Sequence, residues 1–350
     1  MNSNLHIAVL RLSALGDVML CASMVLHLVK SGKFKVSWIT TDQTRLLLGD
    51  IPGVDFIIVP KPKSLKTFFE CQKILKGYSF DCLLLAQASF SAHFVSMSVR
   101  SKRKIGFDAS RSRDLHGFFV NERIDGKEEH FLDAYYRFAC ELGLQNPAEF
   151  NWDGLFQAEN DKILQKLNLP QGKPILAVNP SASKSERNWT IDSYIKVIDY
   201  AHQKGLAVVV IGGSMKIELK LNSEICSTCL VSPVNLTGKI ELPQLPYLLK
   251  EVDILLAPDT GSIHIARAVG TPVIGLYAVA NPSLTGPYRA DEFSVNKFDL
   301  ALERFSDSKN ISFYSRVHHP DTMSLIQTDE VISKVDAILD RLSLLPFDKE

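Results

Sequence analysis

The clearest candidates for catalytic or ligand-binding residues lie between two short apolar runs, 252–257 and 272–277, each typical of a buried strand. The turn 259–262 carries one acid and two hydroxyls, and it leads into a short helix that Gly270 ends. The first N–H groups of such a helix lack partners and carry about half a positive charge. A helix start at the carboxyl end of a parallel strand therefore favours a phosphate ligand. The alternative is that Asp259 only caps the helix.

A second turn of this kind follows the first apolar run, 5–10. It occupies 11–17 and ends in Gly16 and Asp17, where a helix is predicted to begin. Glycine lets another molecule approach the backbone closely, and a carboxylate exposed there is placed to act as a general base. The alternative is again a simple helix cap. Because G-x-G-x-x-G and G-x-x-x-x-G-K-[ST] are both absent, the turn is neither a dinucleotide fingerprint nor a P-loop.

Cations stand in two further places. The loop 179–189 combines serine hydroxyls with Lys184 and Arg187, a set that suits a diphosphate. The segment 100–113 is basic in an otherwise balanced chain, and guanidinium groups there suit phosphate or carboxylate. Its cations are Arg100, Lys102, Arg103, Lys104, Arg111 and Arg113. For both segments the alternative is an ordinary solvated surface.

Composition limits the class of protein. The 350 residues suffice for two cores, and hence for two domains. Lys plus Arg number 39, as do Asp plus Glu, so no overall field attracts nucleic acid. The apolar run 7–10 is too short for a signal peptide, and no run approaches the ~20 residues of a membrane span. The six cysteines are scattered, and Cys226 and Cys229 lack partners at zinc spacing, so we expect reduced thiols in a cytoplasmic protein.

Strand-like and helix-like stretches alternate along the chain, which indicates a parallel, doubly wound α/β sheet. In the first half the pattern predicts strands at 5–10, 35–40, 55–59 and 81–86, and helices at 18–29, 68–75 and 92–99. After a polar connection over 150–173 with one short helix, it predicts strands at 174–178, 206–211, 252–257 and 272–277, and helices at 191–203 and 241–250. A last amphipathic helix is predicted over 328–342.

These motifs resemble those of the ADP-heptose:lipopolysaccharide heptosyltransferase family, glycosyltransferase family 9. The resemblance covers essentially the full length and rests most on residues 11–18, 259–264 and 270–272. It implies an α/β fold of GT-B type, in which two Rossmann-like βαβ domains face a central cleft. The implied domains are an acceptor-binding one over 1–160 and a nucleotide-sugar-binding one over 161–327. The C-terminal helix segment, 328–350, is expected to pack back on the N-terminal domain.

The resemblance also implies roles for individual residues. Asp17 matches the family's catalytic base. The expected donor-binding residues are Ser181, Ser183, Lys184, Arg187, Asp259, Thr260, Gly261, Ser262 and His264. The expected acceptor-binding residues are Ser13, Gly16, Arg103, Arg111 and Arg113.

The chain departs from the family pattern at two positions. Arg187 stands where a lysine often neutralises the diphosphate, which keeps the charge but alters the hydrogen-bond geometry. Met215 stands where some members carry a glutamate that touches the donor, and Glu218 follows further on. The second departure leaves the donor sugar open.

The activity implied is an inverting transfer of heptose from ADP-L-glycero-D-manno-heptose to the Kdo/heptose inner core of lipopolysaccharide, without metal or cofactor. The implied partners are the ADP-heptose donor, the lipid A–Kdo acceptor and the cytoplasmic face of the inner membrane, touched peripherally; nucleic acid is not expected. Two alternatives stay open. One is a transferase that uses another nucleotide sugar, and the other is a non-catalytic protein of the same fold that binds a nucleotide sugar or an anionic glycolipid.

Overall fold

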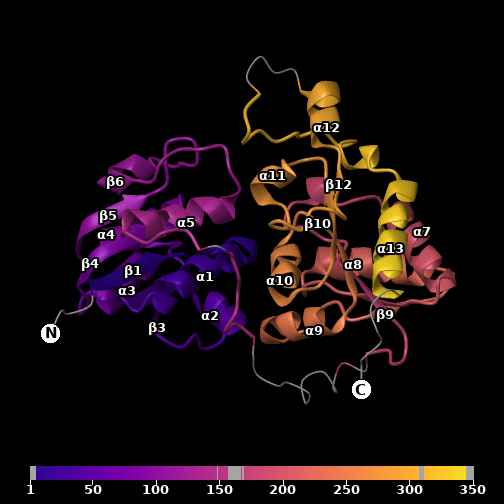
Figure 1. Cartoon of the computed structure of the whole chain (residues 1–350), viewed down its shortest axis with the longest axis horizontal. Coiled ribbons are helices and arrows are strands. Elements are labelled where there is room, and N and C mark those ends of the chain that lie inside the picture. The colour runs from indigo at the N-terminus through magenta and orange to yellow at the C-terminus, as the bar shows by residue number, and fades with distance from the viewer. Residues whose placement is uncertain (1–4, 148, 157–166, 168, 307–310, 344–350) are drawn as a thin grey trace. The chain divides into compact units, whose positions relative to one another are not determined.

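The computed structural model describes residues 5–147, 149–156, 167, 169–306 and 311–343. The chain divides into two compact units, Met1–Gln157 and Ala158–Glu350. Residues 157–166 and 168 of the predicted connection over 150–173 lie outside the described residues, and the described residues of that connection do not form the expected short helix. Each unit is an α/β layer structure built on one parallel sheet (Figure 1).

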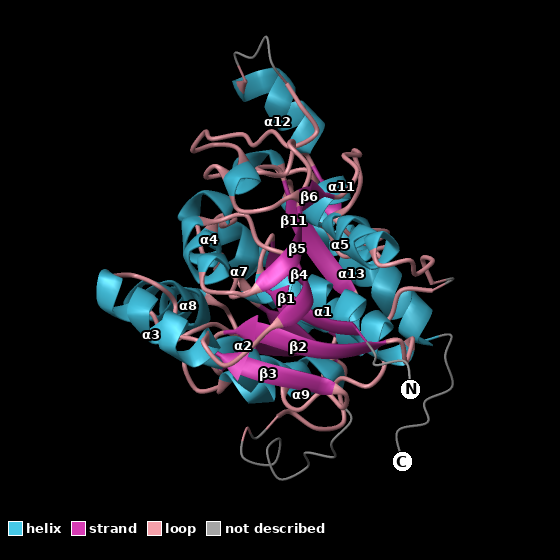
Figure 2. Cartoon of the chain, turned by 90° about the vertical axis from the view of Figure 1, so that its left-hand side faces the viewer, coloured by secondary structure: helices cyan, strands magenta, loops and turns pink. Residues whose placement is uncertain are grey.

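The sheet of the first unit has the strand order β3-β2-β1-β4-β5-β6, and all of its strands run parallel. The strands are β1 (Leu5–Leu10), β2 (Phe34–Thr40), β3 (Val54–Ile58), β4 (Phe80–Leu85), β5 (Ser101–Gly106) and β6 (Glu122–Arg123). The helices are α1 (Leu15–Lys30), α2 (Asp42–Leu48), α3 (Leu65–Leu75), α4 (Phe90–Met97), η1 (His116–Phe118) and α5 (Phe131–Glu141). Helices α3 and α4 cover one face of the sheet, and α1 and α5 cover the other (Figure 2).

The second unit repeats this topology. Its strands follow the order β12-β11-β10-β7-β8-β9, so the first and fourth strands of each unit, β1 with β4 and β7 with β10, are neighbours. The strands are β7 (Ile175–Val178), β8 (Ala207–Val210), β9 (Val234–Asn235), β10 (Ile254–Pro258), β11 (Val273–Tyr277) and β12 (Val295–Asn296). In open parallel sheets, ligands bind at the carboxyl ends of the strands, where the strand order reverses. In both sheets, therefore, the site should lie between the first and fourth strands.

Helices follow most strands of the second unit. They are η2 (Ser185–Arg187), α7 (Ile191–Gln203), α8 (Lys216–Thr228), η3 (Leu242–Gln244), α9 (Leu245–Glu251), α10 (Gly261–Val269), α11 (Pro282–Thr285), α12 (Phe298–Phe305), η4 (Met323–Leu325) and α13 (Thr328–Ser343). None of the helices in the described ranges is long and apolar enough to span a membrane.

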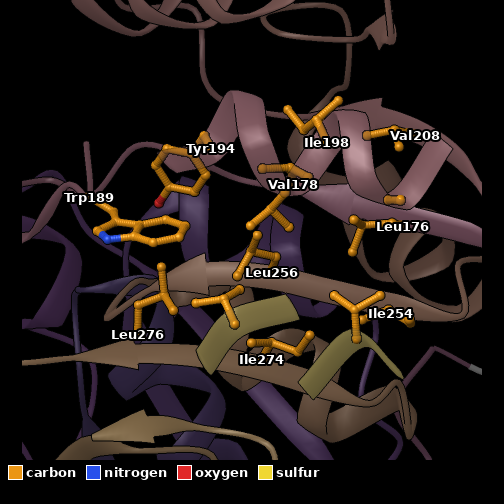
Figure 3. Close-up of a cluster of buried hydrophobic side chains, with 14 of the residues drawn as sticks. Leu176, Val178, Trp189, Tyr194, Ile198, Val208, Ile254, Leu256, Ile274 and Leu276 are labelled. Atoms are coloured by element: carbon orange, nitrogen blue, oxygen red, sulfur yellow. The ribbon is translucent and has the colours of Figure 1, made fainter. Parts of the chain in front are cut away.

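The core of the second unit fixes the loop that follows β7. Apolar side chains of β7, β10 and β11 are buried with Trp189 and Tyr194, whose rings meet edge to face at 5.2 Å (Figure 3). The indole N–H of Trp189 donates to the carbonyl of Ile326 at 3.1 Å. Because Trp189 ends the polar loop 179–189, its burial anchors that loop on the sheet.

Helix α13 belongs to the core of the second unit. Its apolar residues Val331, Val335 and Ile338 are buried in the core of the second unit, and the helix packs against α7 and β11. Its expected packing on the N-terminal domain stays a prediction, and the residues that form its apolar face are used within the second unit. The periodicity of this helix predicts its apolar face correctly, but it carries no information on which of two sheets that face will cover.

The basic segment 100–113 is also more ordered than its composition indicates. Its first half forms β5, the fifth strand of the sheet. Cations tolerate this position because their stems pack while their charged ends reach partners. The ammonium group of Lys104, for example, donates to the carbonyl of Ser96 at 2.9 Å.

Candidate functional site

The turn after β1 is built around Arg11 and Asp17. One arm of the Arg11 guanidinium donates to the carbonyl of Ala86 at 2.8 Å, and the other forms an ion pair with the Asp17 carboxylate. The Arg11 side chain is 8% exposed and that of Asp17 is 35% exposed. Burial opposes the charge of Arg11, but Asp17 and Tyr135 outweigh it, and its pKa is raised. The turn therefore exposes the Asp17 carboxylate to solvent while the Arg11 cation that pairs with it stays buried.

Neighbouring strands hold the backbone of this turn in place. The side-chain carbonyl of Gln87, just after β4, accepts from the N–H groups of Leu12 and Ser13 at 2.7 and 3.3 Å. The hydroxyls of Thr41 and Thr44 donate to the carbonyl of Leu12 at 3.0 and 3.2 Å. Side chains from two other segments thus fix the geometry of the turn before any ligand binds.

In the second unit, the loop after β7 contacts the turn after β10 through side-chain interactions. Arg187 lies 3.1 Å from the Asp259 carboxylate and also donates to the Asp259 carbonyl at 3.2 Å. The Asn179 amide donates to the Ser262 hydroxyl at 3.0 Å. Both side chains of the Arg187–Asp259 pair are nearly buried, 13% and 12% exposed. The structure therefore brings together the segments 179–189 and 259–262, each of which the sequence predicts separately as a phosphate-binding segment.

Helix α10 begins at Gly261, and its N-cap residue is Thr260, whose side chain makes no capping hydrogen bond. Asp259 lies one residue further out and pairs with Arg187, so the alternative that it only caps the helix is wrong. The start of α10 therefore combines helix N–H groups with a guanidinium held beside them. That combination suits an anion.

The other expected donor residues lie around this start. Ser181, Ser262 and His264 are buried, whereas Ser183 and Lys184 are exposed on the same loop. The neighbouring Tyr277 ends β11, and burial followed by the charge of Asp259 raises the pKa of its phenol well above 10. Tyr277 is thus a neutral hydroxyl beneath the ion pair.

Glu218 lies close to the backbone of Gly213. A Cβ added at Gly213 would stand 2.5 Å from a Glu218 carboxylate oxygen, so the end of the Glu218 side chain lies directly against this glycine. Met215, in contrast, is exposed at the N-cap of α8. The carboxylate near the Gly212–Gly213 turn is therefore supplied by Glu218, three residues later than the family pattern predicts.

Two of the three arginines expected to bind the acceptor have carboxylate partners in the first unit. The Arg111 side chain has no exposed surface; it pairs with Asp108 at 2.5 Å and with Glu129 at 3.4 Å. Arg111 is thus part of the interior, and this burial disfavours its expected contact with the acceptor. Arg103 is partly exposed, but its guanidinium is held by Glu122 at 2.8 Å.

Arg113 differs from these two because it is exposed. It lines a hollow of about 510 Å³ together with Arg123, Asp114 and Phe118. Of the expected acceptor residues, Ser13 and Gly16 lie in the Asp17 turn, and Arg113 lies in this hollow.

Sequence reasoning missed Arg11, Gln87, Asn179 and Tyr277 as site residues. Arg11 carried one usable signal, a charge placed directly after a buried strand.

A histidine pair lies under the same hollow. The Nε2 atom of His93, on α4, is 2.9 Å from Nδ1 of His116, and His116 Nε2 accepts from the N–H of Phe107 at 3.0 Å. Burial, and then the neighbouring His93 and Arg123, lower the pKa of His116 to about 4. Because both nitrogens of His116 are engaged in a buried setting, this imidazole is neutral at physiological pH.

We expect the Arg11→Met variant to lose about 2 kcal/mol of unfolding free energy, because Asp17 loses its partner and Ala86 its donor. Urea unfolding measures the loss. The control is Lys35→Met, which removes an exposed ion pair with Asp55 and should cost less than about 1 kcal/mol. Equal losses in the two variants would contradict a buried, supporting role for Arg11.

The low pKa of His116 predicts a pH dependence of stability. Its pKa is lower in the folded than in the unfolded chain, so the unfolded chain binds more protons between about pH 6.5 and 4. The contribution of neutral His116 to the free energy of unfolding is fully present above pH 6.5. It falls as the pH drops through this window, by up to about 1.4 kcal/mol per pH unit. Urea unfolding at several pH values should show a shallower fall for His116→Gln. An identical fall would refute the assignment.

Comparison with known proteins places these features in a family. The profile of glycosyltransferase family 9 (heptosyltransferase) matches residues 68–309. The chain is 34% identical over 333 residues to the lipopolysaccharide core heptosyltransferase OpsX of Haemophilus influenzae, covering 94% of this chain and 95% of that protein.

Solved structures share the fold. A family 9 glycosyl transferase from Veillonella parvula superposes with a TM-score of 0.78 at 20% identity, covering 96% of this chain and 97% of that one. E. coli heptosyltransferase WaaC with ADP gives a TM-score of 0.72 at 17% identity, covering 95% and 99%. The two parallel sheets are thus those of a GT-B fold, as expected. The chain belongs to glycosyltransferase family 9, the heptosyltransferases.

Proposed function

We propose that this glycosyltransferase moves heptose from ADP-L-glycero-D-manno-heptose to the Kdo/heptose inner core of lipopolysaccharide, with inversion and without a metal. The observation that carries the proposal is the Arg187–Asp259 pair at the start of α10. The relatives named as lipopolysaccharide heptosyltransferases, and the WaaC structure with ADP, support the choice of donor and acceptor.

The start of α10 would hold the diphosphate of the donor. As the bond from the anomeric carbon to the diphosphate breaks, its electron pair passes to ADP and negative charge grows on the phosphate oxygens. Helix N–H groups, Arg187 and the exposed Lys184 can stabilise that charge. Asp259 has a positioning role, because its carboxylate fixes the Arg187 guanidinium at the helix start.

Asp17 would act as the general base. It takes the proton of the acceptor hydroxyl while the hydroxyl oxygen attacks the anomeric carbon from the face opposite ADP. A base must be open to its substrate, and the partly exposed carboxylate of Asp17 meets that requirement. Arg11 fixes the orientation of that carboxylate from below. This geometry favours a catalytic role over the non-catalytic alternative.

Glu218 bears on the identity of the donor. Its carboxylate beside Gly213 would supply the donor contact that Met215 cannot make. The ADP-heptose assignment therefore does not require a glutamate at 215.

On the acceptor side, we assign Arg113 and its hollow to the acidic sugar or phosphate groups of lipid A–Kdo. The enzyme would work at the cytoplasmic face of the inner membrane, in peripheral contact with it.

Mass spectrometry of a reaction with ADP-heptose and a truncated Kdo-lipid A acceptor tests the proposal. The wild-type chain should add one heptose mass. Asp17→Asn should slow transfer by about 10²–10⁴-fold, because the base is lost, while the affinity for ADP stays within about twofold. The matched control is Asp42→Asn, which changes an exposed first-turn aspartate of α2 and should transfer normally.

Two results would contradict this account. Undiminished transfer by Asp17→Asn would remove its role as base and would favour a binding protein or a different catalytic group. A collapse of ADP affinity in the same variant would assign Asp17 to the donor instead of the acceptor.

A further inference from the structure

Helix α4 is apolar on two opposite faces. Ala92 and Val95 are buried in the core of the first unit, as expected for a helix that covers a sheet. Phe90, Phe94 and Met97 are spaced by four and three residues, and they are 58%, 47% and 57% exposed. A surface helix normally turns polar side chains to water. The outer face of α4 therefore has the composition of a contact surface.

Helix α3 extends this surface. It packs beside α4, and the Phe68 and Phe94 rings meet edge to face with centroids 6.0 Å apart. Leu65 and Phe69, one helical turn apart on α3, are also exposed, at 78% and 59%. Two adjacent helices thus present large apolar side chains to solvent.

The η1 segment adds a third part. The His93–His116 hydrogen bond ties η1 to α4, and the Phe119 ring stacks on His93 at 4.5 Å. Next to these, Phe118 is 84% exposed. We call six strongly exposed apolar side chains of α3, α4 and η1 the outer apolar face; they are Leu65, Phe69, Phe90, Phe94, Met97 and Phe118.

Cations gather beside the outer apolar face. Three exposed lysines, Lys61, Lys63 and Lys66, lie at the start of α3. Lys73 and Lys76 follow at its end, and Glu70 is the one acid between residues 60 and 78. This local excess stands out in a chain whose net charge is zero. Arg113 and Arg123 add positive charge in the hollow next to Phe118.

We propose that the outer apolar face docks on the surface of a bilayer that contains anionic lipids. Apolar side chains would enter the boundary between headgroups and acyl chains, and the lysines would meet lipid phosphates. A second copy of this chain fits less well, because two such faces would bring their lysines together.

The position of this face relates it to the catalytic turn. Helix α4 begins three residues after Gln87, which holds the N–H groups of Leu12 and Ser13. The face therefore starts at the same edge of the sheet as Asp17. The inference rests on the proposed function in one respect: a lipid-linked acceptor would then reach Asp17 from the membrane on which the enzyme is docked.

Vesicle co-sedimentation of the full chain tests the docking without donor or acceptor. We expect binding to vesicles of phosphatidylcholine mixed with phosphatidylglycerol, weakened by salt, and little binding to phosphatidylcholine alone. Phe90→Ser/Phe94→Ser/Met97→Ser should weaken binding by about tenfold or more. Lys61→Gln/Lys63→Gln/Lys66→Gln changes only exposed side chains, so it keeps its fold and should weaken binding similarly. The control Ile217→Ser/Leu230→Ser removes equally exposed apolar residues of the second unit and should bind like wild type.

Wild-type binding by both triple variants, or no wild-type binding to anionic vesicles, would overturn the proposal. So would a wild-type dimer that the serine variant dissociates, because the face would then join two copies. A de-acylated, water-soluble acceptor separates this inference from the proposed function. The serine variant should transfer heptose to it at the wild-type rate but lose transfer to a vesicle-borne acceptor. If wild type transfers to neither, the proposed function fails, while the vesicle result still decides the docking.

Discussion

An arginine–aspartate ion pair lies at the reversal of strand order in each sheet, and the candidate site depends on these two pairs. Arg11 pairs with Asp17 beside β1, and Arg187 pairs with Asp259 beside β10. A nearly buried guanidinium costs several kcal/mol unless a carboxylate compensates it, so each pair fixes the turn around it. An amide side chain from the neighbouring strand, Gln87 or Asn179, completes both turns. One topology thus supplies the same kind of support twice.

The two pairs differ in what they leave exposed, and that difference separates their proposed roles. In the first unit the cation is buried and the carboxylate faces solvent, which suits proton transfer. In the second unit both partners are nearly buried beside the start of a helix, which suits a bound anion whose charge grows during reaction. The central cleft expected from the family resemblance stays a prediction, as do the inverting course and the absence of a metal from the reaction.

The sequence predicted what depends on local pattern. Buried parallel strands are continuous apolar runs, so the runs 5–10 and 252–257 gave their strands, and the polar turns after them gave Asp17 and Asp259. It could not predict what depends on distant partners. Strand β5 is rich in cations, so its composition indicates a basic segment instead of a strand. Asp108 lies only three residues from Arg111, but that spacing does not reveal that both side chains are buried together with Glu129, 18 residues away. The sheet that α13 covers and the support from Gln87 likewise appear only in three dimensions.

The proposed reaction depends on a sugar diphosphate that binds at the start of α10 beside Arg187. A crystal structure of the chain with ADP bound tests it most directly. We expect phosphate oxygens within hydrogen-bonding distance of the N–H groups that open α10, with the Arg187 guanidinium still held by Asp259 and directed at the same phosphates. ADP bound with its diphosphate away from α10, in either unit, would show that this helix start is not the donor site.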